Sequence, residues 1–204
     1  MKNKSGYIYE GSEDLEIDPE DVKNIYVLEN FISPEDIITL RNYIENSDFV
    51  LSDYGVHEFP LAALHFSGEV ATLMQGYRDK AALILEQTFD CSITRSEIAS
   101  LTRYATGQNL NEHADKICES WRDLSTSMYY NDDYTGGELF FSQYDLSFTP
   151  KAGMMIYFPA GGNYAHGVNE VTSGTRYATT TFWKVEKWNS IQYSWYNIGL
   201  KTIS

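Results

Sequence analysis

The chain has 204 residues, a formal net charge of −14 at pH 7 and 15% aromatic residues. This length is typical of one domain, or of one domain with a short extension. The negative charge disfavours nucleic acids and anionic lipid surfaces, because binding to both depends on Lys and Arg. The high aromatic content favours a folded sheet protein. We therefore expect neither a nucleic-acid partner nor a membrane partner.

The sequence also indicates where the protein is located and the state of its cysteines. No apolar run approaches the ~18 residues that a membrane helix needs, and residues 1–22 lack the apolar segment of a signal peptide. We therefore expect a cytoplasmic protein. Cys91 and Cys118 have neither CxxC spacing nor a nearby histidine, so we expect reduced, structural thiols rather than a zinc site.

The first quarter of the chain contains an extension, a strand and a loop. Residues 1–22 are acidic and polar, without a sustained apolar period, which indicates an irregular extension to a single domain over residues 23–204. The segment 24–31 is typical of a strand. Residues 50–66 mix Gly, Pro and aromatics without a clear period, so we expect a loop or short strands and a candidate active-site lid.

Two helices are predicted on either side of that loop. Ser33 has the properties of an N-cap and Pro34 those of a first helical residue, and the apolar spacing that follows predicts a helix ending near Asn46. A second amphipathic period predicts a helix over residues 67–87, although Gly76 lies inside it.

From residue 93 onward the pattern changes to short β-prone runs separated by Gly, Asn, Asp and Pro. These runs are residues 97–105, 125–131, 138–142, 154–158 and 177–183. Their spacing predicts an antiparallel sandwich or barrel rather than βαβ units. The fold class we expect is therefore an all-β core with flanking α-helices.

Three residues have the pattern of a metal site. His113 and Asp115 stand two apart, so within one strand their side chains would lie on the same side. His166 is the only histidine downstream of this pair. Two histidines and one carboxylate leave coordination positions open, as iron(II) oxygenases require. His57 and His65 lack a partner at ligand spacing, and we expect them to be surface or packing residues.

Arg176 and Tyr104 have spacings that suit the binding of a carboxylate near this metal. Arg176 lies ten residues beyond His166, and with a period of two it shares a strand face with the small side chain of Ala178. A guanidinium binds a carboxylate bidentately, and the hydroxyl of Tyr104 would donate a second hydrogen bond. The alternatives are a surface arginine and a half-buried sheet tyrosine.

Taken together, these motifs resemble the prolyl 4-hydroxylase-like branch of the 2-oxoglutarate and Fe(II)-dependent dioxygenase superfamily. RYATGQNLNEHAD leads into the His113 and Asp115 pair, and GGEL, FTPKAGMMIYF, His166 and Arg176 follow in order. IYVLENFISPEDI resembles the start of that family's catalytic domain, so the resemblance covers most of residues 24–188. It implies a double-stranded β-helix, a cupin-like jelly roll of two sheets, with the amino-terminal helices packed on the major sheet.

The resemblance also implies an activity. In it His113, Asp115 and His166 bind Fe(II), Arg176 and Tyr104 bind 2-oxoglutarate, and ascorbate is the expected reductant. The family couples oxidative decarboxylation of 2-oxoglutarate, to succinate and CO2, with hydroxylation of an unactivated carbon. The substrate it favours is a peptidyl proline, in a procollagen-proline 4-dioxygenase-like reaction.

Several alternatives concern the substrate and the class of protein. Arg122 matches a family position near the substrate entrance, but it is also suited to a salt bridge at the end of a strand. Arg176, Leu139 and Phe182 stand where the branch commonly has Lys, Thr and Trp, which leaves the shape of the pocket open. A free amino acid or another small molecule therefore remains an alternative substrate.

Two further classes are less consistent with the sequence. Repair of alkylated nucleic acid by a related oxygenase is opposed by the net charge of −14. A non-catalytic jelly-roll binding protein is opposed by the complete metal-ligand set together with Arg176. Nothing in the sequence indicates an oligomeric state.

Overall fold

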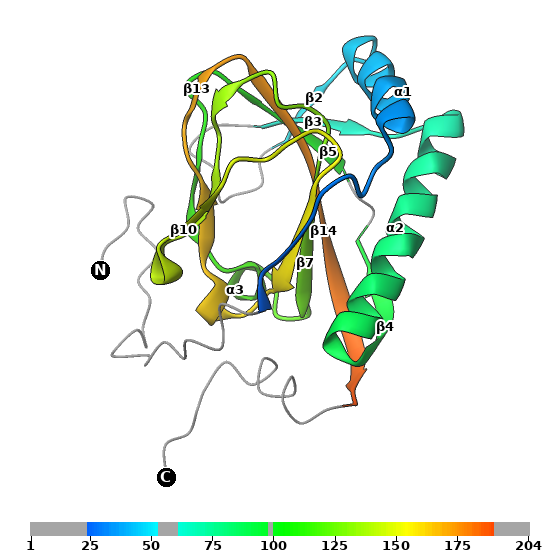
Figure 1. Ribbon diagram of the computed structural model, residues 1–204, viewed down its shortest axis with the longest axis vertical. Helices are drawn as coiled ribbons and strands as arrows, with labels where there is room; N and C mark the ends of the chain where they lie inside the picture. Colours follow the sequence, from blue (N-terminus) through cyan, green and yellow to red (C-terminus); the bar gives the residue numbers. More distant parts are fainter. Residues whose placement is uncertain (1–23, 53–60, 98–99, 190–204) are drawn as a thin grey trace.

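Strands dominate the chain in the computed structural model, which describes residues 24–52, 61–97 and 100–189 (Figure 1). The expected extension at residues 1–22, His57 and the centre of the candidate lid lie outside these residues. The elements, in chain order, are β1 (Tyr26–Leu28), α1 (Pro34–Glu45), β2 (Val50–Ser52), β3 (Leu61–His65), α2 (Gly68–Phe89), β4 (Cys91–Ser96), β5 (Ser100–Ala105), β6 (Leu110–His113), α3 (Asp115–Cys118), β7 (Leu124–Tyr129), β8 (Thr135–Gly136), β9 (Leu139–Phe141), β10 (Leu146–Phe148), β11 (Met155–Pro159), β12 (His166–Val168), β13 (Val171–Ser173) and β14 (Thr175–Trp188).

The strands form two main sheets. The large sheet has the order β1-β11-β7-β14-β5-β3-β2, with β4 also paired to β14. The small sheet has the order β10-β9-β12-β6, and β13 pairs with β8 in a separate two-stranded ribbon. All the strand pairs among the described residues are antiparallel. The predicted all-β core with flanking helices is confirmed.

Both predicted helices are present, and α1 and α2 lie on the same side of the large sheet (Figure 1). The backbone N–H of Asp36 donates to the Ser33 hydroxyl at 3.1 Å, which is the expected N-cap bond. α1 ends at Glu45, beside the predicted end. α2 extends two residues past its predicted end and stops where Asp90 adopts a left-handed conformation. None of the described helices is long and apolar enough to span a membrane.

The predicted strands are confirmed in the second half of the chain and shortened in the first. Only Tyr26–Leu28 of the segment 24–31 forms a strand, because the chain turns at Asn30, whose φ is +54°. The described ends of the segment 50–66 form β2 and β3, which pair at the edge of the large sheet. The described part of that segment is therefore short strands, one of the two structures expected there.

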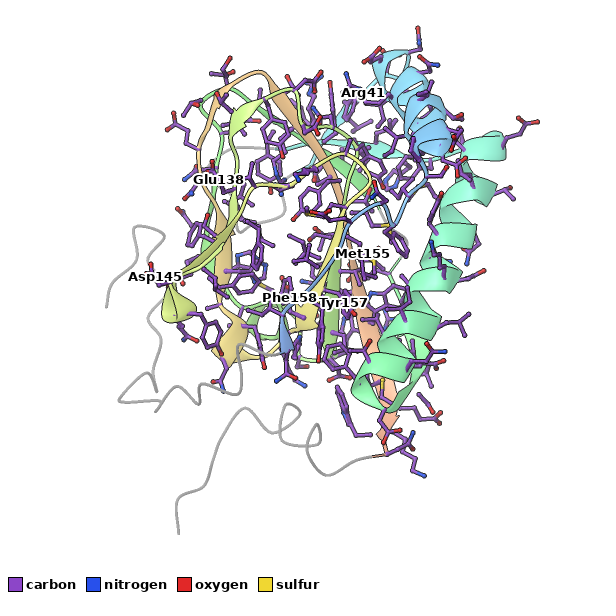
Figure 2. All side chains as sticks on the ribbon, in the orientation of Figure 1. Arg41, Glu138, Asp145, Met155, Tyr157 and Phe158 are labelled. Carbon is purple, nitrogen blue, oxygen red and sulfur yellow. The ribbon has the colours of Figure 1, made fainter. Side chains whose placement is uncertain are left out.

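Successive residues of the large sheet face two different cores. The helix-side core lies between this sheet and the helices and includes Leu40, Ile44, Leu85, Phe89, Met128 and Trp183. The inter-sheet core lies between the two sheets and includes Tyr129, Leu139, Phe141, Ile156, Phe158 and Ala178. Strand β11 shows the alternation, with Met155 and Tyr157 in the first core and Phe158 in the second (Figure 2).

Candidate metal centre

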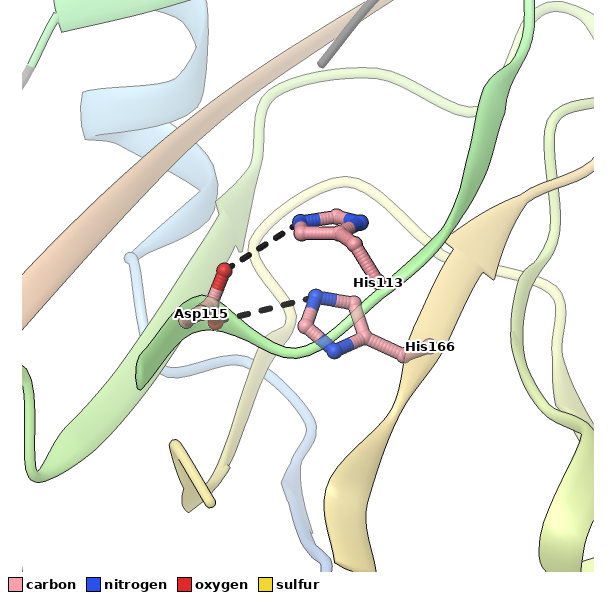
Figure 3. Close-up of side chains that lie close together, drawn as sticks. All are labelled: His113, Asp115 and His166. Atoms are coloured by element: carbon pink, nitrogen blue, oxygen red, sulfur yellow. Dashed lines mark ion pairs between the residues drawn. The ribbon is translucent and has the colours of Figure 1, made fainter. Parts of the chain in front are cut away.

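Three side chains from three elements converge between the sheets. His113 ends β6, Asp115 begins α3, and His166 opens β12. β6 and β12 are neighbours in the small sheet, where His113 and His166 are direct cross-strand partners. Nε2 of His113 lies 3.3 Å from Oδ1 of Asp115, and Nε2 of His166 lies 3.7 Å from Oδ2 (Figure 3). One ligand atom from each residue lies within 4.8 Å of the others, so one ion can contact all three.

The prediction that His113 and Asp115 share one strand is wrong. β6 ends at His113, Ala114 remains extended, and Asp115 starts a four-residue helix. The chain leaves the small sheet because the backbone N–H of Lys116 donates to the carbonyl of Ala160 at 2.9 Å, and because Ser125 donates to the Asp115 carboxylate at 2.6 Å. The extended Ala114 between the two ligands is enough to bring both side chains to the same site.

Backbone carbonyls orient both imidazoles. Nδ1 of His113 lies 3.0 Å from the carbonyl oxygen of Asn111, and Nδ1 of His166 lies 2.9 Å from that of Tyr164. A neutral imidazole that donates from Nδ1 keeps the lone pair of Nε2 for a metal. In both residues Nε2 is the atom directed toward Asp115. Two nitrogen donors and one carboxylate are thus aligned for a single ion.

The protonation states of Asp115 and His166 also suit metal binding. Burial alone would raise the pKa of Asp115, but the two imidazoles and the Ser125 hydroxyl outweigh it and lower this pKa to about 2. Burial lowers the pKa of His166. Burial also acts to lower the pKa of His113, but the hydrogen bond and charge of Asp115 outweigh it and leave that pKa raised. Near neutral pH Asp115 is therefore ionised and His166 is neutral, as ligands must be.

A second polar cluster surrounds Arg176, which is only 3% exposed. Arg176 pairs in register with Tyr104 of β5, and its guanidinium carbon lies 5.0 Å from the Tyr104 ring and 5.1 Å from the Tyr129 ring. Nε of Arg176 and the hydroxyls of Tyr129 and Tyr134 are buried and make no hydrogen bond within the described residues. Burial raises the pKa of Tyr134 to about 12 and also raises that of Tyr129, so both phenols stay neutral donors.

Unpaired buried donors of this kind are rare, because each loses its hydrogen bonds to water without replacing them. A carboxylate bound between the guanidinium and the phenols would satisfy them. Ser125, which holds Asp115, and Tyr129, which lies beside Arg176, are four residues apart on one face of β7, or about 13 Å at ~3.3 Å per residue. The metal ligands and the guanidinium therefore lie toward opposite ends of one strand face.

Sequence reasoning selected Arg176 and Tyr104 as candidates but not the two tyrosines that the structure places beside Arg176. A period of two counted from Ser125 along residues 125–131 would have placed Tyr129 on the ligand side. Tyr134 follows β7 in a loop, where no periodic signal exists. Its position depends on the fold, which brings Tyr134 next to Gly137 and Arg176.

Arg122 forms the salt bridge that the sequence left open. Its Nη2 lies 3.1 Å from Oε1 of Glu97, and its guanidinium carbon lies 3.7 Å from the centre of the Phe182 ring. Its Nε is buried and makes no hydrogen bond among the residues described. Binding of substrate by Arg122 stays a prediction.

The remaining candidate residues lie apart from the ligand set. His65 is exposed at the end of β3, in agreement with the expected surface position. Cys91 is buried and Cys118 is exposed, and both are free thiols. Leu139 is 2% exposed in the inter-sheet core.

Two antiparallel sheets around two histidines, one carboxylate and a buried arginine are the arrangement typical of one class of protein, the jelly-roll metal-dependent oxygenases. Residues 99–184 match the model of the 2OG-Fe(II) oxygenase superfamily. The matched residues include all three ligands and Arg176, and the fold is the predicted double-stranded β-helix. The description of the matched superfamily gives Fe(II) as the metal and 2-oxoglutarate as the cosubstrate. The residues fit both, since the three ligands suit iron and the unpaired donors around Arg176 suit a dicarboxylate.

Several proteins similar to this chain are named hydroxylases. The chain is 40% identical over 72 residues to human prolyl 3-hydroxylase 2, covering 33% of this chain and 10% of that protein. It is 29% identical over 164 residues to a PKHD-type hydroxylase from Acaryochloris marina, covering 74% of each. A solved prolyl hydroxylase from Trichoplax adhaerens, in complex with a hypoxia inducible factor peptide fragment, has a TM-score of 0.66 at 15% identity, covering 80% of this chain and 84% of that one. The chain spans about a tenth of the length of the prolyl 3-hydroxylase.

Proposed function

We propose that the protein is a 2-oxoglutarate- and Fe(II)-dependent dioxygenase that hydroxylates an unactivated carbon, with a peptidyl proline as the preferred substrate. One observation carries the proposal: the ligand set of His113, Asp115 and His166 occupies the same inter-sheet space as the buried guanidinium of Arg176, whose Nε makes no hydrogen bond among the described residues. A binding protein without redox chemistry does not need an open metal site and a buried cation together.

Each residue has a role in this proposal. His113, Asp115 and His166 hold Fe(II), and Arg176 with Tyr104 and Tyr129 holds the distal carboxylate of 2-oxoglutarate. When bound, Fe(II) and 2-oxoglutarate would supply the electrons that activate dioxygen, which is the oxidant: one oxygen atom enters succinate as CO2 is released, the other enters the substrate, and ascorbate is the proposed reductant that keeps the iron as Fe(II).

The protein contributes placement and electrostatics. The ionised Asp115 supplies one negative charge to the metal, and the Ser125 hydroxyl keeps its carboxylate in one orientation. The guanidinium of Arg176 fixes the cosubstrate at its far end, which determines the direction in which the rest of the molecule extends along β7.

A peptide substrate is supported by the similar proteins. Both the human relative and the Trichoplax neighbour are named prolyl hydroxylases, and the latter was solved with a peptide fragment. We propose hydroxylation at C4 of proline, with C3 as the second candidate because of the identity to prolyl 3-hydroxylase 2. Arg122, whose guanidinium lies over Phe182, is the proposed substrate contact. Free amino acids and other small molecules are the alternative substrates.

The first experiment tests the enzyme class. Purified protein with Fe(II) and ascorbate is expected to decarboxylate 2-oxoglutarate slowly without substrate, as measured by succinate formation. His166→Ala should abolish this turnover, because it removes a metal ligand. His65→Ala is the matched control, since His65 is exposed and lies outside the ligand set, and it should retain full turnover. Equal turnover in wild type and His166→Ala would exclude the proposed metal centre.

The second experiment tests the substrate. Proline-rich peptides incubated with the active enzyme should gain the mass of one oxygen, and chromatography of the hydrolysed product separates 3-hydroxyproline from 4-hydroxyproline. A mass gain on residues other than proline, or on small molecules alone, would contradict the proposed substrate class while leaving the oxygenase intact.

A further inference from the structure

The turn that carries Asp115 has little apolar anchoring. α3 has four residues, and Asp115 is the only one that is buried. Ile117, its apolar residue, is 61% exposed, and Cys118 is exposed as well. A helix of one turn is not stable by itself, because nucleation costs more than its few hydrogen bonds return. Specific polar contacts must therefore hold this turn against the rest of the domain.

Lys116, the residue after the metal ligand, makes two such contacts. Its backbone N–H donates to the carbonyl of Ala160 at 2.9 Å. Its Nζ donates to Oδ1 of Asp123 at 2.7 Å. The Asp123 side chain is fully buried, and only 17% of the Lys116 side chain is exposed. The ion pair is thus largely shielded from water. A shielded ion pair is stronger than one at the surface.

Asp123 is itself fixed to β14 by contacts that do not involve Lys116. Its Oδ2 accepts hydrogen bonds from Nζ of Lys184 at 2.8 Å and from the backbone N–H of Val185 at 2.9 Å. Its own N–H donates to the carbonyl of Trp183 at 2.8 Å. One carboxylate therefore connects the central strand β14 to Lys116, the residue next to Asp115.

Stability alone does not explain a buried carboxylate with two ammonium partners. Removing these charges from water is costly, and well-packed apolar residues at such positions commonly stabilise a protein as much or more. What an ion pair adds is a defined geometry, because each oxygen accepts from a particular donor. Here Oδ1 accepts from Lys116, in the turn that carries Asp115, and Oδ2 accepts from Lys184 and Val185 of β14.

We propose that Asp123 is a positioning residue for the metal carboxylate and acts through Lys116. Ser125 fixes the orientation of the Asp115 carboxylate, and the Lys116–Asp123 pair fixes the backbone from which that side chain extends. Without this ion pair, the turn that carries Asp115 would no longer be held in position relative to His113 and His166. The inference rests on the proposed metal centre and adds a requirement for its assembly.

The test compares two lysines that share one carboxylate. Lys116→Met and Lys184→Met in the full chain each remove one ammonium from Asp123, but only Lys116 belongs to the metal-bearing turn. Mn(II) affinity of the metal-free protein, from electron paramagnetic resonance of unbound Mn(II), is the readout and needs no turnover. Loss of a residue that orients a ligand typically lowers metal affinity 10- to 100-fold, so we expect about that loss for Lys116→Met and less than about threefold for Lys184→Met.

Further variants complete the comparison. Lys116→Arg, which keeps the cation, should recover most of the affinity, and thermal unfolding of the metal-free variants shows whether both methionine changes leave a folded protein. If Lys116→Met does not fold, Lys116→Gln replaces it in the same comparison. Equal losses for the two lysines, or no loss for Lys116→Met, would overturn the positioning role. His166→Ala separates the two proposals, because wild-type Mn(II) affinity in that variant would refute the metal centre itself.

Discussion

The two faces of the large sheet treat buried polar groups differently, and two adjacent residues of one segment show how. Tyr130 lies in the helix-side core, and its hydroxyl donates to Oγ1 of Thr179 at 2.8 Å. Tyr129 lies in the inter-sheet core, and its equally buried hydroxyl makes no hydrogen bond within the described residues. The first phenol therefore has its hydrogen-bond partner within the fold, and the second can still donate a hydrogen bond to a ligand.

Strand β14 repeats this contrast. On the helix side, Nε1 of Trp183 donates to Oγ1 of Thr126 at 3.0 Å. On the inter-sheet side, Nε of Arg176 is buried and unpaired among the described residues. Because strand side chains alternate, one sheet can stabilise the fold with one face and bind a ligand with the other. Unpaired buried donors are tolerated where a ligand supplies the missing acceptor.

The largest expected effect comes from removing the unpaired cation. Arg176→Met should weaken 2-oxoglutarate binding by about 2–5 kcal/mol, the usual cost of removing one partner of a buried charge pair. Folding stability should stay the same or rise, because an unpaired buried charge is lost. Calorimetric titration of the Mn(II)-loaded protein measures the affinity, and thermal unfolding measures the stability. Unchanged cosubstrate affinity would contradict the role of the inter-sheet face.

A cavity in the helix-side core should have the opposite effect, lowering folding stability and leaving ligand affinity unchanged. Leu85→Ala, in α2, creates a cavity at a residue with no exposed surface and should lower the free energy of unfolding by about 2–5 kcal/mol. The affinities of the folded protein for Mn(II) and 2-oxoglutarate should not change. Urea unfolding and the same titration test this, and a loss of affinity matching the loss of stability would show that the two faces are coupled.

The adjacent tyrosines provide a finer test. Tyr130→Phe should lower folding stability by about 1 kcal/mol, because it removes the hydrogen bond to Thr179, and should leave cosubstrate affinity unchanged. Tyr129→Phe should have the reverse effect, with little change in stability and a loss of about 1 kcal/mol in 2-oxoglutarate affinity. Similar effects from both variants would remove the distinction between the faces.

The smallest effect should come from a contact outside both cores. Arg41 of α1 lies 3.0 Å from Asp133, beyond the end of β7, and this hydrogen bond lowers the pKa of the Asp133 carboxyl. A carboxyl with a lowered pKa in the folded protein stabilises it above the ordinary pKa of 3.8, and this stabilisation is lost as pH falls through the lower value. Arg41→Met should therefore slightly lower the unfolding temperature at neutral pH and have less effect in acid. An equal effect at both pH values would exclude this pair as the cause.

The sequence predicted those features that depend on local signals. The Ser33 cap and the apolar period located the helices, and residue type together with spacing selected His113, Asp115, His166 and Arg176 as candidates. The helical turn at Asp115 was not predictable, because Ser125, which belongs to β7, and Ala160, which follows β11, contact it only once the strands have packed.

Residues that acquire a role only through packing were also missed. Tyr134 lies beside Arg176, but it belongs to a loop, which has no periodic sequence signal. No local pattern marks Asp123, since its contacts with Lys184 and Val185 require β7 and β14 to be neighbours. Such contacts depend on strand order, which local patterns do not encode.

A crystal structure of the protein grown without oxygen in Mn(II) and 2-oxoglutarate tests the central claim most directly. The account predicts one metal ion bonded to Nε2 of His113, Nε2 of His166 and the Asp115 carboxylate, with 2-oxoglutarate extending from the metal to Arg176. A metal ion bound elsewhere, or a cosubstrate whose distal carboxylate does not contact Arg176, would contradict it.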